Sequence, residues 1–285
     1  MGNLKESKVR KYLVLILIVN IQVFNAQSLK VMTYNIRLSL ESDGENSWTN
    51  RKDFSTSQIQ FYEPDIFGVQ EATPSQVTDI KNYLPKYNYI GIGREGIGKG
   101  ESSNIYYKNE RFAVTQETTF WLSETPSIIS KGWDAACNRV CTYALFKDKI
   151  SKKEFWVFNT HLDHLGEIAK TKGIQLILDR IQLVNNTKYP VIFMGDFNSE
   201  PFEERIISLK REMLDCREIA KQKPFGPSGT FNGFKHNEPV EKLIDYIFVS
   251  KNSYFIIKKY AVLSDSKDLK YPSDHLPVYV EINFK

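Results

Sequence analysis

The sequence predicts a single α/β domain in which two mixed β-sheets pack together and helices lie outside them. Three observations support this fold class. Strand-like segments outnumber helical ones, hairpins mix with strand–helix–strand units, and no long linker, repeat or low-complexity tract interrupts the chain. An all-parallel, doubly wound sheet would need a helix after each strand, and this chain does not have that order.

Ten segments have the composition of strands because they are rich in Val, Ile, Phe and Tyr and end in turn residues. In chain order they are Leu29–Ile36, Ile66–Gln70, Ser103–Tyr107, Phe112–Leu122, Val140–Phe146, Glu154–Thr160, Val191–Met194, Leu243–Val249, Tyr254–Leu263 and Pro277–Phe284. Four segments have helical patterns, and the clearest is Glu167–Asn185, in which Ile174 and Ile177 fall on one face. The other three are Arg51–Tyr62, Gln76–Leu84 and Glu203–Met213.

The segment GIGREG, Gly91–Gly96, matches a dinucleotide-binding pattern and follows a strand-like segment. A dinucleotide site needs a helix to begin at that point. Here Gly98, Gly100 and the strand-like SSNIYY follow instead. We therefore expect a glycine-rich hairpin loop.

The N-terminus has the pattern of a secretory signal peptide, with a basic head, a short apolar run from Tyr12 to Phe24, and Ala26 at the cleavage position. The apolar run is shorter than the ~20 residues of a spanning helix, which favours cleavage over an uncleaved anchor. We therefore expect a signal peptide at residues 1–26, a catalytic domain at residues 27–285, and a secreted or periplasmic location.

The net charge of the chain does not indicate which class of substrate it binds. The formal net charge is +4, but residues 1–26 carry +3 of it, so the remainder is close to neutral. Strong nucleic-acid binding usually depends on Lys and Arg that neutralise phosphates. The three cysteines, Cys137, Cys141 and Cys216, form no zinc signature and are too few for a disulfide scaffold, although one bridge from Cys216 remains open.

The stretch VIFMGDFNSEP begins as a buried strand and then places Asp196 and Asn198 at its end. Two positions at i and i+2 on an extended backbone point the same way, which is the arrangement of a site. Five further strand ends carry polar residues, at Asn35, Glu71, His161, Asp245 and Asp274–His275. Each alone has an ordinary structural explanation, as a turn residue, a cap or a buried histidine. Burial of so many polar groups together is costly unless they serve one another or a ligand.

The motifs TYN, QE, THLDH, GDFN, IDYIFV and SDHLP occur in that order between residues 33 and 277. In this respect the chain resembles the endonuclease/exonuclease/phosphatase superfamily of divalent-metal phosphoesterases, over nearly all of residues 29–285. FWLSETP and GWDAACNR further resemble a bacterial subgroup of that superfamily. The resemblance implies a four-layer α/β sandwich and hydrolysis of a phosphate ester.

The same resemblance implies Mg²⁺ as cofactor, with Mn²⁺ as a possible substitute, because hard cations prefer oxygen ligands. Glu71 is the first expected ligand, with Asn35 beside it and Asp274 as a further one. Asp245 or Asp196 would join if a second metal binds.

His275 and Asp245 resemble the His–Asp pair of the family, in which the carboxylate fixes the imidazole tautomer and raises its pKa. His275 takes the acid/base role, and either His275 or Asp196 activates the attacking water. Asn198 and His161 are expected to donate hydrogen bonds to the phosphoryl oxygens.

Arg139 is a candidate for substrate binding, because a guanidinium suits a phosphate, although a salt-bridged structural arginine is equally consistent with the pattern. Nucleases of the family often carry an acid shortly after the first-strand asparagine. Arg37 stands there instead, which weakens direct transfer of the nuclease details.

The substrate stays open among nucleic acid, a sugar or other small-molecule phosphate, and a phospholipid head group. Specificity should lie in the loops at 94–104 and 123–138. The sequence implies no protein partner, and we expect a monomer. The alternative function is a non-catalytic binding module that kept the fold; it predicts gaps in the set of polar residues, and the sequence has none among the eight positions.

Overall fold

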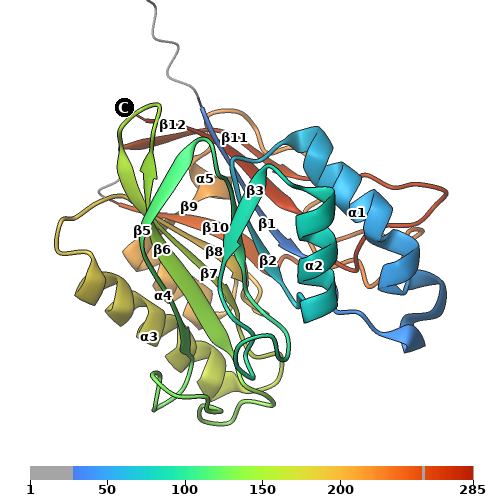
Figure 1. The fold of residues 1–285 in the computed structure, drawn as a ribbon, viewed down its shortest axis with the longest axis horizontal. Coiled ribbons are helices and arrows are strands. Elements are labelled where there is room, and N and C mark those ends of the chain that lie inside the picture. Colours follow the sequence, from blue (N-terminus) through green and yellow to red (C-terminus); the bar gives the residue numbers. More distant parts are fainter. Residues whose placement is uncertain (1–27, 252–253, 285) are drawn as a thin grey trace, which may run out of the picture.

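The computed structural model describes residues 28–251 and 254–284, and two six-stranded sheets face each other in its centre (Figure 1). The first sheet has the spatial order β11 (Phe255–Val262), β12 (Val278–Phe284), β1 (Leu29–Asn35), β2 (Ile66–Gln70), β4 (Ile105–Lys108) and β3 (Tyr87–Ile90). The second has the order β5 (Phe112–Trp121), β6 (Val140–Asp148), β7 (Glu154–His161), β8 (Val191–Asp196), β10 (Asp245–Ser250) and β9 (Met213–Asp215). The predicted signal peptide lies outside the described residues.

Helices cover the outer face of each sheet (Figure 1). Helices α1 (Trp48–Tyr62) and α2 (Pro74–Tyr83) lie on the first sheet, and α3 (Glu167–Val184) and α4 (Glu204–Glu212) lie on the second. The short helices η1 (Glu41–Asn46) and α5 (Cys216–Ile219) stand in connections. The predicted four-layer α/β sandwich is therefore confirmed.

Both sheets are mixed because each contains one strand–helix–strand crossover. Strands β1 and β2 are parallel and are joined through α1, and β7 and β8 are parallel and are joined through α3. The remaining pairs are antiparallel. The ends of the parallel strands and the beginnings of their antiparallel neighbours therefore meet at one edge of the sandwich.

The main core lies between the sheets, where apolar side chains of both inner faces interdigitate. Val31 and Ile66 from the first sheet belong to the same buried cluster as Val157 and Ile192 from the second. Two further clusters lie under the helices, and Ile177 of α3 is fully buried in one of them. Burial of aliphatic side chains of this size typically contributes about 1.5–3 kcal/mol each. The three clusters therefore stabilise the sheets whose strand ends carry the polar residues.

All ten predicted strands and all four predicted helices are present, with ends that differ by a few residues. The helix predicted to reach Met213 ends at Glu212, and Met213 instead begins β9, a short strand that the sequence did not reveal. The glycine-rich segment after β3 forms the expected hairpin loop, since β3 and β4 pair antiparallel across it and no helix begins there.

All three cysteines are free thiols, and Cys141 and Cys216 are buried among apolar side chains, as small hydrophobic residues. Across residues 28–251 and 254–284, the helices are all too short or too polar to span a lipid bilayer.

Candidate active site

The eight predicted site residues meet at the edge where the parallel strands end. Asn35, His161 and Asp196 are the last residues of β1, β7 and β8, and Glu71 follows the last residue of β2. Asp245 begins β10 directly opposite Asp196, because these two strands pair antiparallel in that register. Asp274 and His275 lie four and three positions before Val278, the first residue of β12, and this strand begins beside the end of β1. The topology therefore collects side chains that are up to 240 positions apart in the chain.

These residues surround a cleft of about 480 Å³. Glu71, His161, Asp196, Asn198, Asp274 and His275 line it, whereas Asn35 and Asp245 stand behind the lining and bond to residues in it. The cleft is also lined by Arg37, Arg94, Glu101, Arg139 and His164. Of these five, the sequence singled out Arg139 alone as a candidate.

His275 lies between two carboxylates at the bottom of the cleft. Its Nδ1 is 2.9 Å from Oδ2 of Asp245, and its Nε2 is 3.7 Å from Oδ2 of Asp196. Burial alone would lower the pKa of His275, but the charges of Asp245 and Asp196 outweigh it and raise that pKa to about 10. The ring is therefore an imidazolium at neutral pH, with both nitrogens as donors.

Asp196 has the opposite balance. Burial and the neighbouring charge of Asp245 raise its pKa to about 7, and the favourable charge of His275 offsets only part of this effect. Its carboxylate accepts from the side-chain amide of Asn35 at 2.9 Å and from the backbone N–H of Asn198 at 2.9 Å. A buried carboxylate with a pKa close to neutral is suited to accept a proton.

Asn198 is not on an extended backbone, contrary to the reasoning from the i and i+2 spacing. Its φ is +45°, so the chain turns at the end of β8, and the Asn198 N–H closes the turn onto Asp196. Phe197 packs into the core between them. Both polar side chains still line the cleft, but the turn brings them there rather than the strand.

Asn198 and His161 are joined at the wall of the cleft. The Asn198 amide Nδ2 lies 3.0 Å from Nε2 of His161 and 3.1 Å from the carbonyl oxygen of Leu162. Burial, together with the charges of Arg139 and His275, lowers the pKa of His161 well below its ordinary value. A neutral His161 accepts from Asn198 through Nε2 and carries its proton on Nδ1.

Glu71 occupies a strained position, since its φ is +64°. Asn35 donates to its Oε1 at 3.0 Å and the backbone N–H of Leu38 donates to its Oε2 at 2.9 Å, while the Asn35 oxygen accepts from the backbone N–H of Arg37 at 3.0 Å. These bonds hold the Glu71 carboxylate at the cleft.

Glu71 and Asp274 fit a hard divalent cation. Burial raises the pKa of Asp274, the charge of His275 opposes that shift, and the charge of Glu71 adds to it. Two carboxylates that repel each other across one cleft are stabilised by a cation between them, and oxygen donors are those that Mg²⁺ prefers. Asp196, Asp245 and His275 also have ligand atoms within 4.8 Å of one another, but a cation there would displace His275 from Asp245.

Three arginines reach the cleft, and each is paired with an acid. Arg37 makes two hydrogen bonds to Asp43, at 3.0 and 2.9 Å, and Arg139 pairs with Asp163 at 3.3 Å. Neither Asp43 nor Asp163 lines the cleft, so these two arginines have their acids behind them. Arg94 has its partner, Glu101, beside it in the cleft wall at 2.7 Å.

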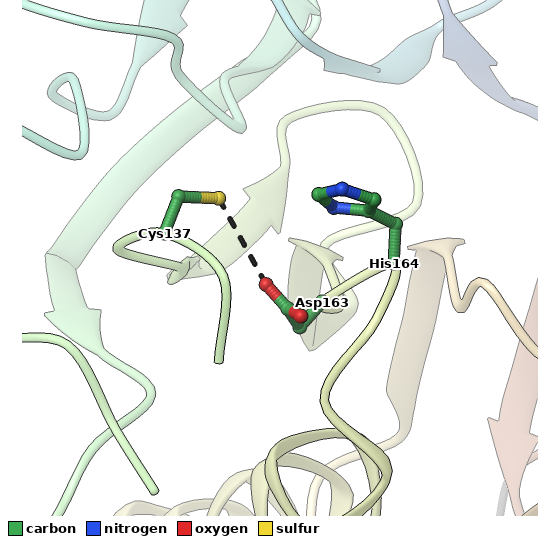
Figure 2. A group of neighbouring side chains, drawn as sticks. All are labelled: Cys137, Asp163 and His164. Carbon is green, nitrogen blue, oxygen red and sulfur yellow. Dashed lines mark hydrogen bonds between the residues drawn. The ribbon is translucent and has the colours of Figure 1, made fainter. Parts of the chain in front are cut away.

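Cys137, Asp163 and His164 form a second group whose potential ligand atoms lie within 4.8 Å of one another (Figure 2). Asp163 accepts from three backbone N–H groups in the loops around it, those of Ala136, Leu165 and Gly166. Cys137 Sγ and His164 Nδ1 each already accept from a guanidinium, that of Arg94 at 3.4 Å and that of Arg139 at 3.0 Å. Burial also raises the pKa of the Cys137 thiol. The group therefore organises two loops and orients two arginines, and it is a poor metal site.

Arg37, Arg94, Glu101 and His164 are charged or titratable cleft residues that reasoning from the sequence missed as site residues. Arg37 stood out only as a departure from the nuclease pattern, and Arg94 lies within the glycine-rich segment 91–100. Both loops named as carriers of specificity do contribute to the lining, through Arg94 and Glu101 from one and Ala136 and Cys137 from the other.

The chain is similar to several known proteins. The model of the endonuclease/exonuclease/phosphatase family matches residues 32–275. Two solved structures from Bacteroides thetaiotaomicron, a protein of that family and a mannosyl-6-phosphatase, are each 37% identical to this chain, with a TM-score of 0.85. Both alignments cover 90% of this chain, and they cover 98% and 100% of the respective structures. Rat nocturnin is 22% identical over 290 residues; the alignment covers 90% of this chain and 66% of nocturnin.

Proposed function

The chain belongs to the endonuclease/exonuclease/phosphatase family, whose members hydrolyse phosphate esters, and from this premise we propose that it is a metal-dependent phosphomonoesterase. The proposed substrate is a monoester of a small alcohol that carries several hydroxyl groups. The observation that carries the proposal is the position of His275 between Asp245 and Asp196, beside the carboxylates of Glu71 and Asp274. A non-catalytic binding module would not need a carboxylate with a pKa near neutral, Asp196, beside a histidine that is held protonated, His275.

In the proposed mechanism, Asp196 accepts the proton of the attacking water. Its pKa of about 7 leaves a large ionised fraction at neutral pH, whereas the His275 imidazolium has no free nitrogen to act as a base. His275 instead stabilises the charge that develops on the phosphoryl group, and Asp245 keeps it protonated. The leaving alkoxide takes a proton from solvent water, and Asp196 releases the proton that it accepted to solvent. The proposal therefore assigns the role of base to Asp196 rather than to His275.

Glu71 and Asp274 would hold Mg²⁺, or Mn²⁺ as a substitute, with Asn35 orienting Glu71. When bound, the metal supplies charge neutralisation at the phosphoryl oxygens and favours departure of the leaving alcohol. Asn198 and His161 face the same space, and the Asn198 amide can exchange its hydrogen bond to His161 for one to a phosphoryl oxygen.

Arg37 supports a monoester over a diester. Its guanidinium lies 3.9 Å from Oδ2 of Asp274, and Asp43 fixes its orientation from outside the cleft. The Arg37 guanidinium would be a fixed positive group in addition to the metal. It suits the dianionic phosphate of a monoester, whereas a diester carries only one negative charge. The mannosyl-6-phosphatase, which is 37% identical over 90% of this chain, supports a sugar as the alcohol.

The protein is further proposed to act outside the cytoplasm as a monomer, after cleavage of residues 1–26. The basic head and short apolar run of that segment support this location. N-terminal sequencing of the exported protein should find Gln27 as the first residue. An N-terminus at Met1 in the exported fraction would contradict the proposal.

A substrate panel tests the activity. The purified protein with Mg²⁺ should hydrolyse a hexose 6-phosphate and p-nitrophenyl phosphate faster than bis-p-nitrophenyl phosphate or an oligonucleotide. A chelator should abolish turnover, and Mn²⁺ should restore part of it. The Asp196→Asn variant should remain folded and lose most of its turnover. Faster cleavage of the diester or the oligonucleotide would replace the monoester proposal with a nuclease or phosphodiesterase function.

A further inference from the structure

We infer that Arg94 and Glu101 form a subsite that binds neighbouring hydroxyl groups of the leaving alcohol. This inference rests on the proposed function, since it assigns the part of the substrate that the phosphate-binding residues do not touch. Both side chains line the cleft together with Glu71 and His161, so a phosphate held at the catalytic residues places its ester-linked alcohol within their reach.

The pair is built into the hairpin loop between β3 and β4. The backbone N–H of Arg94 donates to the carbonyl oxygen of Glu101 at 2.8 Å, and the side chains are joined at 2.7 Å. Trp121 Nε1 donates to the Arg94 carbonyl oxygen at 2.7 Å. Because the backbone is fixed from two sides, the guanidinium and the carboxylate keep their positions without a ligand.

The charge arrangement of this pair differs from that of the other two arginines in the cleft. The acids that Arg37 and Arg139 contact most closely, Asp43 and Asp163, lie outside the cleft lining, and Arg37 is a longer 3.9 Å from Asp274 inside it. Arg94 instead has its closest acid, Glu101, beside it in the lining at 2.7 Å, with Glu95 at 3.9 Å outside the lining. A positive group with its counter-charge beside it adds little attraction for a phosphate. It offers donors and acceptors side by side, which is what a neutral alcohol with several hydroxyl groups requires, since each hydroxyl both donates and accepts.

The pair also has unused hydrogen-bonding capacity. The Arg94 guanidinium contacts Glu101 and Cys137, and its buried Nε, 3.9 Å from Glu95 Oε1, has no hydrogen-bond partner within the described residues. Burial raises the pKa of Glu101, with the charge of Arg94 opposing that shift, so this carboxylate is held in a costly environment. The Glu101 carboxylate is paired with the Arg94 guanidinium, and a hydroxyl group of a ligand can supply it with a further donor.

The alternative role for the pair is to hold the loop. A substrate-dependent effect separates the two, because loss of a loop brace would reduce turnover of every substrate alike. The suitable substrates are mannose 6-phosphate, whose leaving alcohol carries hydroxyl groups, and p-nitrophenyl phosphate, whose leaving group carries none.

The test compares Glu101→Gln and Arg94→Met with the wild type and with Lys99→Gln, an exposed position on the same loop that does not line the cleft. We expect the ratio of kcat/KM for mannose 6-phosphate to kcat/KM for p-nitrophenyl phosphate to fall about 10- to 100-fold in either cleft variant, which is the usual effect of losing a charged hydrogen bond. Lys99→Gln should leave the ratio unchanged. The melting temperature of each variant shows that it is folded. One folded cleft variant is sufficient to decide the test.

An unchanged ratio in a folded cleft variant would overturn the subsite, even if both activities fall. A wild type that cleaves p-nitrophenyl phosphate but not mannose 6-phosphate would also overturn it as a sugar subsite, while leaving the phosphomonoesterase proposal intact. A wild type that cleaves neither monoester would overturn the proposed function itself, and the subsite with it.

Discussion

Asp196 and Asp245 are directly paired cross-strand neighbours where β8 meets β10, and both carboxylates are buried beside the ring of His275. Antiparallel register alone would make this pair repulsive. The imidazolium between them offsets that repulsion, which is why the pKa of His275 is raised to about 10. The sheet therefore sets the protonation states of the candidate site through the register of two strands.

The first prediction concerns Asp245. Asp245→Asn keeps the shape of the side chain and removes the charge that holds the proton on His275. We expect kcat to fall about 10²–10⁴-fold, as for loss of the orienting carboxylate in other acid/base sites. In the pH–rate profile of the remaining activity, the decline at alkaline pH should begin at a lower pH than in the wild type, because the His275 pKa falls. A pH–rate profile that keeps the wild-type alkaline limb would contradict the role of Asp245.

The second prediction is the pH dependence of the wild type. The raised pKa of Asp196 means that this base becomes ionised only as the pH rises through about 7, so kcat/KM for p-nitrophenyl phosphate should increase across that range. It should decrease again near pH 10, where His275 loses its proton. The two limbs report the coupled site rather than isolated residues. Activity that is already maximal at pH 5 would exclude Asp196 as the base.

The third prediction concerns Arg37. Arg37→Met removes the guanidinium beside Asp274, and we expect the ratio of monoester to diester kcat/KM to fall about 10- to 100-fold. Asp43→Asn should produce a smaller change in the same direction, because Arg37 stays charged but is less firmly oriented. Equal losses on p-nitrophenyl phosphate and bis-p-nitrophenyl phosphate would show that Arg37 does not discriminate between them.

The fourth prediction tests the metal without relying on turnover. Ligand binding to the folded state raises the melting temperature, so millimolar Mg²⁺ should stabilise the wild type. Glu71→Gln should raise the Mg²⁺ concentration needed for half of that stabilisation at least about 10-fold, because one anionic ligand is lost. Glu95→Gln serves as the control, because Glu95 lies on a loop and does not line the cleft. An unaltered Mg²⁺ requirement in Glu71→Gln would remove Glu71 from the ligand set.

The strands were predictable from the sequence because each buried segment carries a run of β-branched and aromatic residues. Helix α1 had only a weak helical pattern, and the reason is physical. Its buried positions include Arg51, Ser55 and Gln58, which apolar periodicity cannot reveal. Ser55 donates to the carbonyl oxygen of Pro272, so the buried face of this helix serves polar contacts to a catalytic segment.

The polar residues at strand ends were also predictable from composition, because an acid such as Asp196 directly after a buried apolar run differs clearly in polarity from its neighbours. Arg37 and Arg94 lacked that contrast, because an arginine in a loop is ordinary in composition. What makes them cleft residues is the fold of their loops and their acidic partners, Asp43 and Glu101. Such loop geometry, including the left-handed Arg37 at φ +56°, is not visible in residue patterns.

The last prediction concerns Arg51, a buried guanidinium that bonds to backbone carbonyl groups of three segments. It donates to Asn46 at 2.7 Å, to Ile36 at 2.5 Å, to Pro272 at 3.1 Å and to Arg37 at 2.8 Å. Ile36 follows Asn35, the last residue of β1, and Pro272 precedes the Ser273–His275 segment, so this one side chain connects the loop that follows Asn35 with the loop that carries His275.

Arg51→Met should leave several of these carbonyl groups without donors, and we expect the free energy of unfolding to fall by about 2–4 kcal/mol. Lys52→Met, the next position on the same helix, breaks only a partly exposed ion pair with Asp79 at 3.6 Å and should cost less than about 1 kcal/mol. Denaturant titration measures both. Because the two catalytic loops lose a shared anchor, kcat of folded Arg51→Met should also decrease while Lys52→Met keeps wild-type turnover. Equal stabilities for the two variants would mean that the catalytic loops are held by their other contacts and that Arg51 is dispensable to them.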